Sequence, residues 1–289
     1  MSRRGNKRQK AVWTGIMYAA LIGIIILLAF VAYHLYSQWK AEQAYQDVQE
    51  EVQEPEEPEF TGERDGEEAE LPDDIFRDMG NPINFKKLRR INKELYAWIR
   101  VPDTKIDYPI GQNKRNDFYL NHDMYKEPRF AGCIYTEKAN SKDFEDPNTV
   151  IYGHNMIGGT MFSNLHNFRD KKFFKKHPYF YIYTPKYIMV YQVFAAYTYD
   201  DRHILNSFDF SKEKVFRKYI RNIFKVRSMD RHLREDVEVT TDDKIVTLST
   251  CIGNETDKRY LVQGKRLWKG TEDEIPESMK SGGKKKKNK

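Results

Sequence analysis

The 289-residue chain has only two cysteines, Cys133 and Cys251. Two thiols exclude a disulfide-rich scaffold and any metal site built from four thiolates. Apolar residues make up 39% of the sequence and charged residues 32%, which excludes a polytopic membrane protein. Aromatic residues reach 14%, too high a share for a mostly disordered chain. These limits leave a chain with one sizeable or two small globular domains plus extensions.

Charged residues are absent between Lys10 and Lys40, and residues 13–33 form a single apolar run. As a helix of 21 residues this run is about 31 Å long, close to the thickness of a hydrocarbon core. Five basic residues precede the run and acidic residues follow it. This bias predicts a single-pass anchor with its N-terminus in the cytoplasm and the bulk of the chain outside the cell. A cleaved signal peptide is the alternative, but this run is longer than usual and ends in bulky residues.

The charge pattern divides the rest of the chain into segments. Residues 42–74 contain 15 acidic residues and one basic residue, Arg64, among many Pro and Glu. Such a segment buries little apolar surface and is extended by its own charge, so it is typical of a spacer. The predicted organisation is a cytoplasmic basic N-terminus (1–12), a transmembrane anchor (13–36), an acidic Pro/Glu-rich linker (37–74), a folded domain (75–272) and a basic tail (273–289).

Two helices are predicted in the folded domain. Phe85, Leu88, Ile91 and Leu95 have helical spacing and would place one apolar face on a core. Residues 211–228 form an amphipathic helix whose start Ser211 could cap. A shorter helical connection is expected over residues 160–177. The apolar stripe of the helix at 211–228 consists of Val215, Phe216, Tyr219, Ile220, Ile223 and Phe224.

The remaining pattern is that of β-strands. Eight segments are rich in β-branched and aromatic residues, and several are bounded by Gly, Pro, Asn or Asp. They cover residues 97–101, 106–110, 131–136, 149–153, 179–184, 187–198, 244–250 and 260–267. The sequence therefore predicts a mainly β fold, a closed or nearly closed barrel of about eight strands with helical insertions.

Three residues could carry chemistry. Cys251 ends a strand before a polar turn, where a thiol is partly exposed, although a lone Cys is often only a small buried residue. His154 follows a strand within a glycine-containing loop, and six other histidines compete with it. Arg259 begins the last apolar strand, so a hairpin would bring its guanidinium back to the thiol. Such a cation could stabilise negative charge on a carbonyl oxygen, whereas a single Arg is more often a solvated surface charge.

Taken together, the segments around these residues resemble the sortase family. They are TLSTC, which ends at Cys251, the GHN segment around His154 and RYLVQGKR, which begins at Arg259. Their order and spacing are similar to the family signature over roughly residues 80–270, together with the anchor. The helical start of the domain, the insertion at 201–230 and the residue Ser249 resemble class B sortases.

The resemblance implies a sortase-like closed barrel and a membrane-anchored cysteine transpeptidase of a Gram-positive cell. Cys251 would attack the carbonyl after Thr in the C-terminal sorting signal of a secreted surface protein, of Asn-Pro-x-Thr or Pro-Pro-x-Thr type. His154 would protonate the leaving amine and deprotonate the incoming one, and Arg259 would hold the oxyanion or the signal's backbone. Ser249 and Thr250 are candidate substrate contacts. A peptidoglycan amine would then resolve the thioester.

Several alternatives remain open. A hydrolytic cysteine peptidase or amidase would use the same Cys and His with water, and a pilin-polymerising sortase would use a pilin amine. A tethered wall-binding module would need no nucleophile. Cys133 is expected to pack in the barrel rather than to form a disulfide with Cys251. No metal, cofactor or nucleic acid is expected, and the basic tail could contact anionic wall polymers or lipid head groups.

Overall fold

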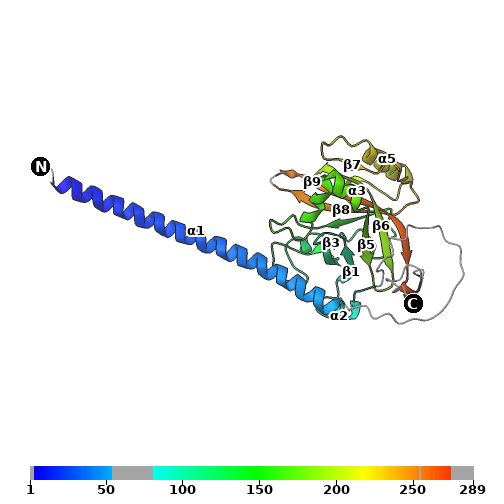
Figure 1. Ribbon diagram of the computed structural model, residues 1–289, viewed down its shortest axis with the longest axis horizontal. Coiled ribbons are helices and arrows are strands. Elements are labelled where there is room, and N and C mark those ends of the chain that lie inside the picture. Colours follow the sequence, from blue (N-terminus) through cyan, green and yellow to red (C-terminus); the bar gives the residue numbers. More distant parts are fainter. Residues whose placement is uncertain (1–2, 54–80, 254, 275–289) are drawn as a thin grey trace, which may run out of the picture. The chain divides into compact units, whose positions relative to one another are not determined.

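The computed structural model of the chain describes residues 3–53, 81–253 and 255–274 (Figure 1). It divides into two compact units, Met1–Tyr45 and Gln46–Lys289. Most of the expected acidic linker, residues 54–74, and nearly all of the expected tail, residues 275–289, lie outside the described residues.

The first unit is the N-terminal part of helix α1 (Arg3–Val52). The large apolar side chains between Val12 and Trp39 are exposed. The segment Val12–Val52 contains an 18-residue window with a mean hydropathy of 2.7, none of which is buried. By length and composition this helix can cross a membrane, as expected for residues 13–36.

The second unit is built on one closed sheet (Figure 1). The strands follow the order β5-β1-β2-β3-β4-β8-β9-β6-β7, and β5 also pairs with β6, so eight strands close a barrel and the short β7 extends from its rim. This confirms the predicted eight-stranded barrel. The strands are β1 (Leu95–Arg100), β2 (Asp107–Gly111), β3 (Ile134–Thr136), β4 (Asn148–Tyr152), β5 (Tyr179–Tyr183), β6 (Ile188–Asp200), β7 (His232–Leu233), β8 (Ile245–Ile252) and β9 (Glu255–Gly270).

Short helices occupy the connections between strands. The helical connection expected over 160–177 is present as η2 and α3. The helix predicted over 85–95 is shorter: it ends at Ile91, and Leu95 already begins β1. The Asn92 side chain accepts a hydrogen bond from Glu94 N at 2.9 Å and donates to Tyr119 Oη, which turns the chain into β1. The helices are α2 (Phe85–Ile91), η1 (Phe118–Leu120), η2 (Ser163–Arg169), α3 (Lys171–Lys176), α4 (Ile204–Ser207), α5 (Glu213–Phe224) and η3 (Glu272–Glu274).

The end of α1 belongs to the second unit and is tied to β2. Val48 and Val52 are fully buried. Gln49 Nε2 donates to the Asp107 carbonyl oxygen at 2.5 Å, and Gln53 Nε2 donates to the Asp107 carboxylate at 2.9 Å. Helix α1 therefore continues past residue 41 and contacts the start of β2.

Helix α5 lies in the insertion between β6 and β7 and packs on the sheet. Phe216, Tyr219, Ile220 and Ile223 form one apolar cluster with residues of β4, β6, β8 and β9. The predicted cap is wrong: the residue preceding the helix is Lys212, and the Ser211 hydroxyl instead donates to Asp209 at 2.5 Å. Burial of the apolar stripe therefore positions this helix without a side-chain cap.

Candidate functional site

The sheet registers bring three predicted residues to one end of the barrel. Cys251 on β8 pairs directly with Arg259 on the antiparallel β9. On its other side β8 runs parallel to β4, where Tyr152 pairs with Ser249. Parallel strands advance together, so His154, two residues beyond Tyr152, emerges beside Cys251, two residues beyond Ser249. The three side chains therefore come from neighbouring strands or their ends.

A pocket of about 230 Å³ joins these residues. Cys251, His154 and Arg259 all line it, as do Ser249 and Thr250. This candidate active-site pocket is further lined by Leu120, Tyr135, Tyr152, Gly153, Tyr199, Asp200, Asp201, Arg202, His203, Ile204 and Leu261. All five site residues expected from the sequence thus border one cavity, while their roles stay predictions.

His154 is held by a carbonyl and an aromatic ring. Its Nε2 lies 2.6 Å from the Leu120 carbonyl oxygen. Because a carbonyl oxygen only accepts, Nε2 carries the proton in this bond and Nδ1 is left to exchange one. The exposed Phe130 ring stacks on the imidazole with centroids 5.5 Å apart. Neutral and charged imidazole can both keep the Leu120 bond.

Cys251 is half-buried, and a histidine side chain holds its backbone carbonyl group. His166 Nε2 donates to the Cys251 carbonyl oxygen at 3.1 Å, and its ring packs against Tyr260 at 5.1 Å. Burial lowers the pKa of His166, so this histidine is neutral near pH 7. Arg169 covers the same Tyr260 ring at 4.9 Å. No sequence pattern indicated this support, because His166 is one of the six histidines that compete with His154.

Arg259 is half-buried beside the thiol. One guanidinium nitrogen donates to the Lys258 carbonyl oxygen at 2.8 Å. In the antiparallel pairing of β9 with β6, Arg259 is directly opposite Tyr199. Since directly paired residues point to the same face of a sheet, Cys251, Arg259 and Tyr199 form one row on that face.

Ser249 and Thr250 differ in orientation. Both are nearly fully buried. Side chains alternate along a strand, so Ser249 shares the face of Cys251 and Thr250 points to the opposite face. The Thr250 hydroxyl has no hydrogen-bond partner among the described residues. Ser249 is thus the better placed of the two for a side-chain contact with a ligand.

A buried acid bonded to two residues of the pocket lining, Tyr152 and His203, was not anticipated from the sequence. The Glu137 side chain is only 3% exposed and lies 2.7 Å from His203 Nε2. The Tyr152 hydroxyl donates to the same carboxylate at 2.7 Å. His203 Nδ1 accepts from Asn206 N at 3.2 Å and so caps α4. This pair ties the β6–β7 insertion to the pocket wall.

The second thiol lies apart from this chemistry. Cys133 is buried just before β3, with its Sγ 3.4 Å from the Ile134 carbonyl oxygen, and neither cysteine is in a disulfide. Within the residues that the structure describes, no three His, Cys, Asp or Glu side chains gather in a group that could hold a metal ion.

Comparison with known proteins gives consistent matches. A family model described as the sortase domain matches residues 99–267. Sortase B of Listeria monocytogenes is 36% identical over 190 residues, covering 64% of this chain and 74% of that protein. The structure of Clostridium perfringens sortase B matches with a TM-score of 0.59 and 31% identity over 64% of this chain and all of that one. Sortase B from B. anthracis in complex with AAEK1 matches with a TM-score of 0.63 and 28% identity over 80% of this chain and 98% of that one.

Proposed function

Because the chain belongs to the sortase family and resembles sortase B proteins, we propose that Cys251, His154 and Arg259 form the active site of a class B transpeptidase. The enzyme is a cysteine transpeptidase that acts on surface proteins bearing sorting signals. The observation that carries the residue assignment is the pocket that all three side chains line, with Cys251 and Arg259 in direct cross-strand register.

In the first half-reaction the Cys251 thiol passes its proton to His154, and the thiolate attacks the carbonyl carbon after Thr in the sorting signal. A C–S bond forms and the carbonyl oxygen gains negative charge, which the Arg259 guanidinium stabilises. When the C–N bond breaks, His154 returns the proton to the leaving amine. The Leu120 carbonyl, 2.6 Å from Nε2, supports the imidazolium while it holds that proton. The products are a thioester and a free C-terminal fragment.

In the second half-reaction an amine replaces the leaving fragment. The acceptor amine gives a proton to His154 and attacks the thioester carbonyl, again with Arg259 facing the oxyanion. The C–S bond breaks, a new amide forms, and the Cys251 sulfur recovers its proton. One amide is exchanged for another, so no external energy source is required. The proposed acceptor is a peptidoglycan precursor amine, and the proposed signal is of Asn-Pro-x-Thr or Pro-Pro-x-Thr type.

The proposed location is the outer face of the cell membrane. Helix α1 has the length and composition of a single membrane span. The basic residues before it favour a cytoplasmic N-terminus, with residues 75–272 as an extracellular catalytic domain. This placement would bring the active site to the wall precursor.

The test is a cleavage assay on a library of sorting-signal peptides, using the full chain in detergent micelles with and without an added amine. We expect cleavage after Thr and a new amide product whose share rises with amine concentration. Cys251→Ala should abolish both products, by more than about a thousandfold. Cys133→Ala, which removes the other thiol, is the matched control and should retain activity.

Three results would redirect the assignment. Free acid as the sole product at high amine concentration would indicate a hydrolytic peptidase or amidase. Full biological function in Cys251→Ala would indicate a non-catalytic wall-binding module. A pilin amine that reacts in preference to wall amines would identify a pilus-assembling sortase.

A further inference from the structure

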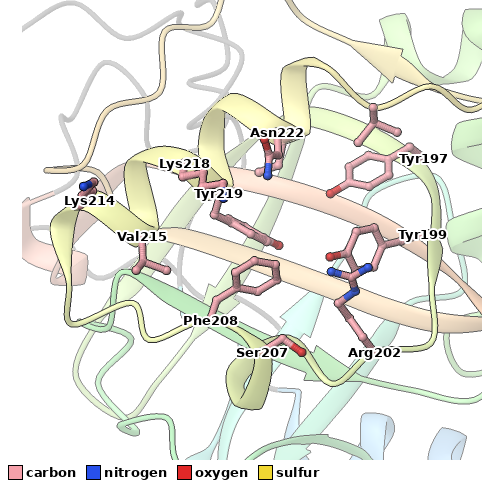
Figure 2. Close-up of a pocket in the computed structure, with 12 residues that line it drawn as sticks. Tyr197, Tyr199, Arg202, Ser207, Phe208, Lys214, Val215, Lys218, Tyr219 and Asn222 are labelled. Atoms are coloured by element: carbon pink, nitrogen blue, oxygen red, sulfur yellow. The ribbon is translucent and has the colours of Figure 1, made fainter.

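A second, larger cavity lies next to the active-site pocket, between α5 and β6 (Figure 2). Its volume of about 620 Å³ falls within the range of small-molecule sites, roughly 300–1,000 Å³. We call it the α5 pocket. Its lining consists of Tyr197, Tyr199, Arg202, Ser207, Phe208, Lys214, Val215, Lys218, Tyr219, Asn222, Ile223 and Val226.

The α5 pocket and the active-site pocket are neighbours that share two lining residues. Tyr199 and Arg202 line both. Tyr199 is opposite Arg259, which in turn is opposite Cys251, so the row crosses two strand spacings. At about 4.8 Å per spacing, the Tyr199 backbone lies roughly 10 Å from that of Cys251. A ligand of that length could occupy the α5 pocket and present a reactive group to the thioester.

The lining combines aromatic rings with positive charge. In Figure 2 the rings of Tyr199, Phe208 and Tyr219 gather in the space between α5 and the strands. No acidic residue is among the residues that line this cavity, whereas Arg202, Lys214 and Lys218 are. Arg202 is neutralised by Asp200, with nitrogen–oxygen distances of 2.7 and 2.6 Å. The exposed Lys214 and Lys218 form no ion pair with a described residue, so their charge is available to a ligand.

We propose that the α5 pocket binds a carboxylate-bearing part of the amine acceptor and so positions its amine at the thioester. The proposal rests on the function proposed above. The sorting signal occupies the active-site pocket in the acyl-enzyme, which leaves the α5 pocket as the adjoining space for a second substrate. Two lysines without an acidic neighbour in the lining favour an anion, and stem peptides of wall precursors carry carboxylates as well as amines. The pocket therefore serves the second half-reaction.

The experiment compares two acceptors that differ in one charge. The full chain in detergent micelles is acylated by a sorting peptide and resolved with 6-aminohexanoate or with its uncharged analogue 6-aminohexanamide. We expect the carboxylate acceptor to have a KM about three- to tenfold lower, the size expected for two exposed charge contacts. Lys214→Gln combined with Lys218→Gln should erase that preference. Arg221→Gln, an exposed cation on the same helix that does not line the cavity, should keep it.

A steric variant provides an independent measurement. Ser207→Trp places a large side chain at the cavity lining and should raise the KM of both acceptors severalfold. The rate of thioester hydrolysis without amine should stay unchanged in every variant, which verifies that the active site is intact. Equal KM values for the two acceptors, or a preference that survives loss of both lysines, would overturn the α5 pocket while the transpeptidase remains. Peptide cleavage without an amide product from either acceptor would instead overturn the proposed function.

Discussion

At the scale of single residues, Arg259 is distinguished by its position rather than by its charge. It is in direct register with Cys251, and its guanidinium already donates to a carbonyl oxygen, that of Lys258. Arg259→Lys keeps the charge but loses the planar fork of donors. Because one oxyanion donor contributes about 2.7–4 kcal/mol to a transition state, we expect kcat/KM to fall roughly a hundredfold or more.

The measurement is steady-state cleavage of a sorting peptide by the full chain. Lys258→Arg serves as a control, since that neighbouring cation is exchanged without altering Arg259. Near-native kcat/KM in Arg259→Lys would remove the guanidinium from the mechanism.

The sequence carried part of the site at this scale. Cys251 and Arg259 lie eight residues apart in one hairpin, so local pattern alone could pair them. His154 comes to the same pocket as Cys251 through the parallel pairing of β4 with β8, which are about a hundred residues apart in sequence, and no local pattern indicates this pairing. The Glu137–His203 pair and the His166 support depend on tertiary packing and carry no sequence signal.

At the scale of elements, β9 is fastened to the β3–β4 connection by charge. Arg266 donates to both Glu145 carboxylate oxygens, at 2.8 and 3.1 Å, and Lys269 lies 2.5 Å from one of them. The hydrogen bond from Arg266 is the main cause that lowers the pKa of Glu145 to about 2. The strand β9 was predictable from the sequence, whereas its long-range pairing with Glu145 was not.

The lowered pKa predicts an acid-dependent loss of stability. The Glu145 carboxylate has a lower pKa in the folded chain than in the unfolded chain. It therefore stabilises the fold above about pH 4.5, and this stabilisation is lost as the pH falls towards 2. Glu145→Gln should therefore lower the free energy of unfolding at pH 7 by about 1 kcal/mol or less, since the carboxylate is 42% exposed. The difference from the unmodified chain should shrink between pH 4.5 and 2. Urea unfolding followed by fluorescence measures this difference. The control is Glu235→Gln, because Glu235 is exposed and forms no ion pair with another described residue. A difference that does not vary with pH would contradict the assignment.

At the scale of the whole chain, the sequence pattern predicted the fold more completely than it predicted the candidate site. The alternation of short apolar segments and turns was sufficient for an eight-stranded barrel, since the strands are rich in β-branched and aromatic residues and several are bounded by turn residues. The insertion helix was visible from its apolar stripe, but its missing side-chain cap was not, because packing against the sheet replaced it. The pairing of β5 with β6, which closes the sheet into a barrel, could be expected only from the number of predicted strands.

The membrane span yields the last prediction. Ile25 lies in the apolar part of α1 and its side chain is 57% exposed, so the chain itself does not cover it. An Asp near the centre of a span costs about 2.5–3.5 kcal/mol on insertion scales, in addition to the lost contribution of Ile. Ile25→Asp should therefore release much of the protein from membranes in alkaline extraction, whereas the unmodified chain stays with the pellet. Ser37→Asp, beyond the expected span, is the matched control and should stay in the pellet as well. If Ile25→Asp and Ser37→Asp partition alike, the helix does not lodge in the hydrocarbon core, and the active site would need another means of reaching a membrane-bound acceptor.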